Sequence, residues 1–166
     1  MMKKKIAAAL VLASLCCLPV LAYNEGPSVY VAQGPVLTAV QQCSLRVDGR
    51  LMDPADGAVL KQKDVVMVPL RKVAENLGYN VNWDPEDQSV RVDAHIASVI
   101  VKPGEDWYER IGSVKRVNLN RIYQFGAGPV NVNGTMYVPA QLFTVFFNRV
   151  VLSDNLVAIT PQYPLP

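Results

Sequence analysis

Cysteine and histidine are scarce in this chain, which contains three cysteines and one histidine in 166 residues. Cys16 and Cys17 lie in an N-terminal apolar segment, so only Cys43 remains beyond it. An internal disulfide is therefore excluded for that part of the chain. We expect Cys43 to be a small buried apolar side chain, and pairing between chains or a modification are the alternatives. A lone His95 disfavours a copper or zinc site, which needs several histidines or cysteines, and a nucleophile pair with Cys43 has no local signature.

A basic patch for phosphate groups is also missing. The chain has 16 basic and 14 acidic residues, a formal net charge of +2. Three of the basic residues are Lys3, Lys4 and Lys5; without them 13 basic residues face 14 acidic ones, and the net charge becomes −1. The charge therefore indicates neither nucleic acid nor anionic lipid as a partner.

Residues 1–22 have the order of a secretory signal. The three lysines precede an apolar run over residues 6–21, and Ala22 offers a small side chain for cleavage. The run is short for a membrane span, which needs about 20 apolar residues, so we expect cleavage after Ala22 and no span thereafter. A retained anchor is the alternative, and lipoprotein processing fits poorly because Leu15 precedes Cys16. Export places the protein in the cell envelope, periplasmic or extracellular.

The acidic clusters match no catalytic or metal-binding pattern. Residues 84–87 place three carboxylates around Pro85, but a calcium loop also needs a glycine at its bend. We interpret this segment as a solvated hairpin turn, and the acids within residues 105–109 as turn charges. We therefore predict no catalytic, cofactor-binding or metal-binding residue, no cofactor and no enzymatic activity.

A proline-centred segment occurs twice. Pro69 and Pro139 each follow an apolar strand and precede an apolar stripe with helical spacing, and an alternating hairpin comes next. Gly78 is the expected left-handed residue after the first helix, and Asn148 takes that place after the second. The first stripe consists of Leu70, Val73, Ala74 and Leu77, and the second of Leu142, Phe143, Phe146 and Phe147.

Short alternating or β-branched segments predict the strands. Their short connections favour antiparallel pairing. The fold class is therefore α+β, with mostly antiparallel twisted sheets packed around two short helices, built from two copies of a strand, proline, helix and hairpin unit. The expected strands are 29–31, 36–37, 44–48, 64–68, 80–83, 89–92, 96–101, 107–111, 114–119, 135–138, 150–152 and 156–159, with tight turns at 48–49 and 133–134.

The expected organisation has four parts. After the signal, residues 23–43 form a linker or extended arm, residues 44–160 form one domain, and residues 161–166 form a tail.

The repeated segments resemble the domain family named after the N-terminal region of copper amine oxidases, also called the stalk domain. The resemblance rests on Val47-Asp48-Gly49, on residues 68–78 with Val68-Pro69-Leu70-Arg71, and on Val81-Asn82-Trp83-Asp84; the second copy is weaker, with Ala140-Gln141 in place of leucine and arginine. It implies an exported or cell-surface bacterial module, often found beside a separate catalytic domain. It implies neither the copper ligands nor the quinone-forming tyrosine of the enzymes that gave the name.

Four side chains are candidates for ligand contact: Arg71, Trp107, Tyr108 and Tyr123. Aromatic rings near loops are the usual means of stacking on sugars or holding a partner chain. Arg71 either binds an acidic wall polymer or pairs with Glu75 one helical turn later, at about 0.3–0.5 kcal/mol. Structural roles fall to Pro69, Gly78 and Pro139, and to Trp83, which is expected to pack over the first helix.

The most consistent function is an exported, non-catalytic binding or scaffolding domain of the bacterial cell envelope, with a cell-wall polymer or an envelope protein as partner. The alternative is an accessory or inhibitory module for a separate envelope enzyme.

Overall fold

The computed structural model describes residues 29–30, 36–113 and 118–161. The predicted signal segment, most of the predicted arm and residues 162–166 lie outside the described residues.

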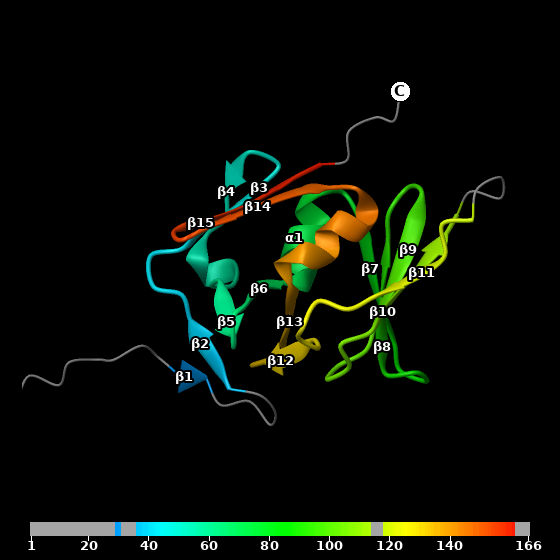
Figure 1. Ribbon diagram of the computed structural model, residues 1–166, viewed down its shortest axis with the longest axis horizontal. Coiled ribbons are helices and arrows are strands. Elements are labelled where there is room, and N and C mark those ends of the chain that lie inside the picture. Colours follow the sequence, from blue (N-terminus) through cyan, green and yellow to red (C-terminus); the bar gives the residue numbers. More distant parts are fainter. Residues whose placement is uncertain (1–28, 31–35, 114–117, 162–166) are drawn as a thin grey trace, which may run out of the picture.

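Three β-sheets surround two helices in the described part of the chain (Figure 1). The helices are α1 (Leu70–Asn76) and the 3₁₀ helix η2 (Ala140–Phe146), and a single turn, η1, covers Pro54–Asp56. The six-stranded sheet has the order β1 (Val29–Tyr30), β2 (Leu37–Ala39), β5 (Leu60–Gln62), β6 (Val65–Pro69), β13 (Thr135–Pro139) and β12 (Val130–Val132). The five-stranded sheet has the order β11 (Arg121–Tyr123), β10 (Tyr108–Gly112), β9 (Ala97–Val101), β8 (Ser89–Asp93) and β7 (Asn80–Asp84). The four-stranded sheet has the order β14 (Arg149–Ser153), β15 (Leu156–Thr160), β3 (Ser44–Val47) and β4 (Arg50–Leu51).

Strand pairing is antiparallel except between β15 and β3, which run parallel. This confirms an α+β fold with mostly antiparallel sheets and two helices. The parallel pair was not expected. It joins Leu45 to Val157, more than 100 residues apart, and no local sequence pattern predicts such a distant partner.

The two proline-bearing strands, β6 and β13, are neighbours inside the six-stranded sheet. Val68 lies opposite Val138, and Pro69 lies opposite Tyr137. Each proline is the last strand residue and the N-cap of the helix, with φ of −69° at Pro69 and −51° at Pro139. The φ imposed by the proline ring suits this extended position as well as a helical one.

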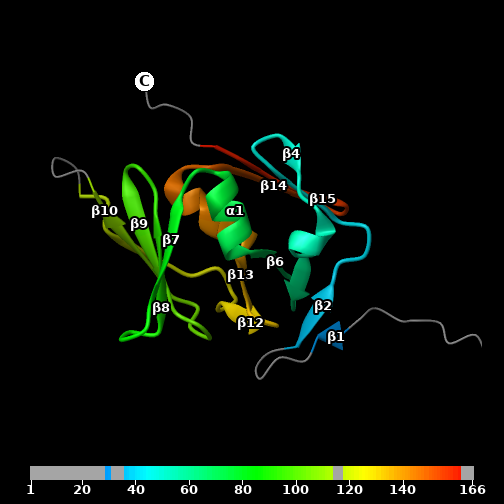
Figure 2. The same cartoon turned by 180° about the vertical axis from the view of Figure 1, so that it is seen from behind.

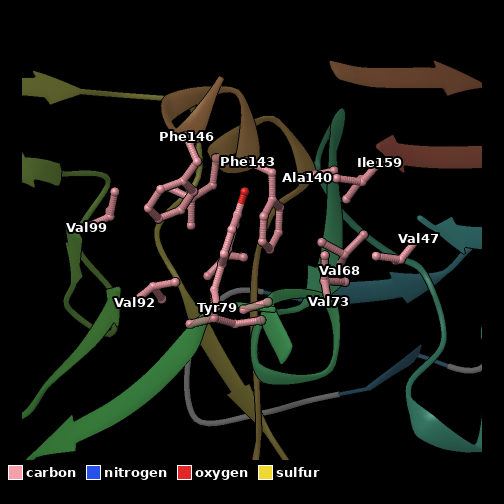
Figure 3. Packing of buried hydrophobic residues seen from close by; sticks show 14 of the residues in the cluster. Val47, Val68, Val73, Tyr79, Val92, Val99, Ala140, Phe143, Phe146 and Ile159 are labelled. Atoms are coloured by element: carbon pink, nitrogen blue, oxygen red, sulfur yellow. The ribbon is translucent and has the colours of Figure 1, made fainter. Parts of the chain in front are cut away.

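One hydrophobic core receives both helices. Val73 and Ala74 of α1 and Phe143 and Phe146 of η2 are fully buried in the same cluster as Val92 of the five-stranded sheet. Figure 3 shows Phe143 and Phe146 above Val73 and Val92 in this cluster. The predicted α1 stripe is confirmed, with Leu70, Val73 and Ala74 buried and Leu77 partly buried.

The second helix differs from its prediction. It is a 3₁₀ helix, and its left-handed residue is Phe147 with φ of +66°, whereas Asn148 was expected there. A 3₁₀ helix has three residues per turn, so the α-helical spacing misplaces its last side chains. Phe147 is 44% exposed instead of buried, and Val145, outside the predicted stripe, is buried.

The hairpins follow the prediction closely. β7 pairs with β8, β9 with β10 and β14 with β15. Positive φ at Asp48, Gly49, Asn133 and Gly134 confirms the two tight turns. Four short strands, β4, β5, β11 and β12, were not predicted. The expected strand 114–119 falls mainly outside the described residues, and 118–119 belong to no element.

Candidate functional site

A groove of about 340 Å³ lies between α1, the β7–β8 hairpin and the β12–β13 turn. We call it the Trp83 groove. Figure 2 shows α1 beside β7, with β12 and β13 below it. Its walls come from four separate parts of the chain. The lining residues are Asp56, Leu70, Arg71, Lys72, Val81, Trp83, Val90, Asn131, Gly134, Thr135 and Met136.

Trp83 forms one wall of this groove. It lies opposite Val90 in the β7–β8 ladder and is 49% exposed. We expected it to pack over the first helix, and it lines the groove together with Leu70, Arg71 and Lys72 at the start of α1. Leu70 and Val90 are both buried and give the groove an apolar floor. A half-exposed tryptophan over such a floor can hold an apolar group of a ligand.

Arg71 stands at the rim and joins α1 to β7. Its guanidinium lies 3.3 Å from a carboxylate oxygen of Glu75 and donates a 3.0 Å hydrogen bond to the carbonyl of Val81. The predicted ion pair with Glu75 is thus present, with both side chains at least half exposed. The bond to Val81 was not predicted, and it covers a backbone acceptor on the open edge of β7. Half of the Arg71 side chain remains exposed to a ligand.

Lys72 and Asp56 close the opposite side of the groove. The lysine nitrogen lies 2.7 Å from a carboxylate oxygen of Asp56, and this hydrogen bond raises the pKa of Lys72. The pair links α1 to the single turn η1. Two cations and one carboxylate therefore line the groove, and Glu75 lies beside it.

The other predicted ligand contacts lie away from the Trp83 groove. Tyr108 is fully buried, its hydroxyl donates a 2.8 Å hydrogen bond to the carbonyl of Ala127, and burial raises its pKa. This corrects the expectation that Tyr108 contacts a ligand, because its strand position faces the core. Trp107 is partly exposed just before β10. Tyr123 is partly exposed on β11 and stacks on Phe125, with centroids 6.2 Å apart and planes 5° apart.

Arg110 is a buried charged side chain that we did not predict. It is 8% exposed, and its guanidinium donates to the carbonyls of Leu119 at 2.7 Å and Val145 at 3.1 Å. The same group lies 5.3 Å from the ring centroid of Tyr123 and 5.2 Å from that of Phe147. Arg110 and Tyr108 share one face of β10, so the alternation of the strand contained a signal for its burial.

Carboxylates of the acidic clusters noted in the sequence accept hydrogen bonds from backbone amides. Asp84 accepts hydrogen bonds from the amides of Glu86 at 2.9 Å and Asp87 at 3.4 Å, as in a solvated turn. Asp106 accepts from the amides of Phe125 at 2.8 Å and Gly126 at 2.9 Å.

Histidine and cysteine side chains do not gather in the described ranges. His95 is exposed in the turn between β8 and β9. Cys43 is partly exposed, and burial raises the pKa of its thiol. Within residues 29–30, 36–113 and 118–161, no group of three or more histidine, cysteine, aspartate or glutamate side chains could hold a metal ion. None of the helices in those ranges has the length and apolar character to cross a bilayer.

Comparison with known proteins gives a family and one curated relative. A protein named "Protease inhibitor" from Brevibacillus choshinensis is 31% identical over 125 residues, which cover 74% of this chain and 35% of the relative. The chain thus spans about a third of the length of the curated relative it matches. No solved structure gives a significant match. The family model for the copper amine oxidase N-terminal domain matches residues 46–156, more than half of the chain, so this chain belongs to that family.

Proposed function

We propose that this chain is an exported, non-catalytic module of the cell envelope that binds a partner protein through the Trp83 groove, as an accessory or inhibitory subunit of a separate enzyme. The half exposure of Trp83 over the apolar floor of Leu70 and Val90 carries the proposal. The inhibitor relative supports an inhibitory role, since its match covers 74% of this chain.

The chemistry of the groove favours a protein partner. Met136 and Val81 extend the apolar floor, and Asn131 and Thr135 add polar groups along one rim. Central aromatic anchors with an arginine at the rim are typical of protein interfaces. We therefore expect an apolar side chain of the partner against Trp83, with a carboxylate near Arg71.

Co-purification from the native envelope tests the proposal. The Trp83→Ala variant should lose the partner that the unchanged protein retains, while Ile122→Ala should retain it. Ile122 is a matched control because it is 54% exposed but lies on β11, outside the groove. Equal retention by Trp83→Ala and the unchanged protein would contradict the use of this groove.

The inhibitory role has its own assay. The purified protein is added to proteases secreted by the source organism, and cleavage of a protein substrate is followed. Truncating a central aromatic anchor costs at least about 2 kcal/mol, or roughly thirtyfold in affinity. The inhibition constant of Trp83→Ala should rise by that factor, and that of Ile122→Ala should not change. Absence of inhibition by the unchanged protein would leave the accessory role but remove the inhibitory one.

A wall polymer is the second candidate partner. The stacked rings of Tyr123 and Phe125, with Arg121 5.5 Å from the Tyr123 centroid, offer an aromatic and cationic face to an acidic polysaccharide. Retention on isolated peptidoglycan, lost in Trp107→Ala and Tyr123→Ala but kept in Trp83→Ala, would favour this candidate over the protein partner.

The two halves of the domain are further proposed to be copies of one unit. The burial sequence along β6 matches that along β13, and the sequence along β7 matches that along β14. The pairing of Val68 with Val138, at corresponding places in the two segments, supports this proposal.

A further inference from the structure

We infer that the open edge of β14 pairs with β14 of a second copy of this chain. β14 is the terminal strand of the four-stranded sheet, and its hairpin with β15 is drawn in orange and red in Figure 1. Val151 and Leu152 on this strand are 41% and 38% exposed. An edge strand of this length with exposed apolar side chains and neither proline nor lysine is a template for pairing with another strand.

The edge strand β7, by contrast, carries side chains that hinder pairing with another strand. β7 and β14 have the same length, the same burial pattern and the same place after a helix. On β7, however, Arg71 donates to the carbonyl of Val81, and the side chains alternate with Asn80, Asn82 and Asp84.

Among the described residues, no side chain donates a hydrogen bond to the carbonyl of Val150, which corresponds to Val81. Gln141 follows Pro139 where Arg71 follows Pro69, and the middle of the strand is Val150-Val151-Leu152. We call the edge of β7 guarded because Arg71 and polar side chains cover it. The edge of β14 is apolar at its middle residues.

The geometry of the hairpin determines which backbone groups face outward. Ser153 pairs with Leu156 across a two-residue turn, and the residues that flank such a turn exchange both of their backbone hydrogen bonds. The same holds for every second residue, so the amides and carbonyls of Arg149, Val151 and Ser153 face β15. Those of Val150 and Leu152 face the open edge. Val81 is the second residue of β7, as Val150 is of β14. The carbonyl of Val81, which accepts the bond from Arg71, therefore corresponds to the carbonyl of Val150.

A second copy fits this edge in an antiparallel register with its twofold axis on Val151. Val150 then lies opposite Leu152 of the second copy, and each such pair exchanges both backbone bonds. Val151 faces itself in a non-hydrogen-bonded pair, where side chains approach closely. Arg149 lies opposite Ser153 of the second copy, beside Asp154, so the basic start of one strand meets the acidic end of the other. No like charges oppose each other in this register.

Cross-linking in a Cys43→Ser background tests the register. Val151→Cys should form a covalent dimer on mild oxidation, because non-hydrogen-bonded partners have Cβ atoms close to disulfide distance. Asn82→Cys, the corresponding position on the guarded edge of β7, should remain monomeric under the same conditions. Equal cross-linking of the two variants would overturn the proposal.

Sedimentation equilibrium tests the association without cysteines. The unchanged protein should reach twice the mass of one chain as its concentration rises. Val151→Lys, which places two lysines on the twofold axis, should stay monomeric, and Asn82→Lys should dimerise like the unchanged protein. Circular dichroism of each variant checks that it is folded. A monomer at every concentration up to the solubility limit would contradict the inference.

Discussion

The hydroxyl of Tyr79 donates a 2.8 Å hydrogen bond to the side-chain oxygen of Asn148, and both groups are buried. Each residue directly follows the left-handed residue that ends a helix, Gly78 after α1 and Phe147 after η2. The amide of Tyr79 donates to the carbonyl of Ala74, and that of Asn148 donates to the carbonyl of Phe143, five residues earlier in both cases. Both helices thus end in a Schellman motif, and the residues that complete the two motifs bind each other.

The Tyr79 ring is central to the core. Figure 3 shows it between Phe143 and Phe146, and its centroid lies 5.1 Å from that of Phe146. Burial raises the pKa of its hydroxyl, which therefore stays protonated and donates.

Replacing Tyr79 with phenylalanine should remove this bond and leave a buried amide oxygen without its donor. We expect the free energy of unfolding to fall by about 1–2 kcal/mol, measured by urea denaturation. Tyr123→Phe is the control, because that ring is partly exposed and its loss of a hydroxyl should cost less than about 0.5 kcal/mol. Equal effects of the two substitutions would show that the Tyr79 bond adds nothing.

Gly78→Ala should destabilise through the backbone alone. Its φ is +79°, and a Cβ at this position would meet nothing within 4 Å. An L-residue in the left-handed region costs about 1–2 kcal/mol, and asparagine tolerates that region better. Thermal unfolding should therefore rank the variants with Gly78→Asn between the unchanged protein and Gly78→Ala. An alanine variant as stable as the unchanged protein would mean that the helix end adjusts.

Arg110 should stabilise the fold by joining the end of η2 to β10. Arg110→Met removes a buried cation and leaves the carbonyls of Leu119 and Val145 without their donor, at a cost of about 2–3 kcal/mol. Arg110→Lys should recover only part of this, because a single ammonium cannot reproduce the planar fork. The control is Arg121→Lys, at an exposed position. Urea midpoints for the three variants provide the comparison.

Asp93 should make the protein sensitive to acid. Burial alone would raise its pKa, but hydrogen bonds from Ser98, Arg91 and Asn82 outweigh this and hold the pKa below its usual range. A lowered folded-state pKa stabilises the fold above the ordinary carboxyl pKa of about 3.9, and the contribution is lost as the pH falls toward the folded-state value. Asp93→Asn should therefore destabilise the fold at pH 7. It should also reduce the fall in the free energy of unfolding between about pH 4 and 2. An unchanged acid slope in urea titrations would exclude this role.

Local patterns were sufficient where one segment decides its own structure. The stripe from Leu70 to Leu77 and the φ requirement at Gly78 predict α1 and its end, and alternation predicts the hairpins. The choice between an α and a 3₁₀ helix at η2 depends on how its side chains meet the core, so the pattern around Phe147 and Asn148 was misread by one residue.

The Trp83 groove could not be predicted because it is a product of tertiary structure. Trp83, Leu70 and Met136 come from three segments that only the β6–β13 pairing and the packing of α1 bring together. The buried Arg110 had a signal in the alternation of β10, but a charged residue in that register is normally assigned to the solvent face.

Site-specific photo-cross-linking tests most directly whether the protein works by holding a partner protein. A photoreactive phenylalanine analogue replaces Trp83 in one variant and Ile122 in another, and both are irradiated in the native envelope. We predict one dominant covalent adduct with a protein at position 83 and none at position 122. Adducts with wall polymer only, or the same adducts at both positions, would contradict the account.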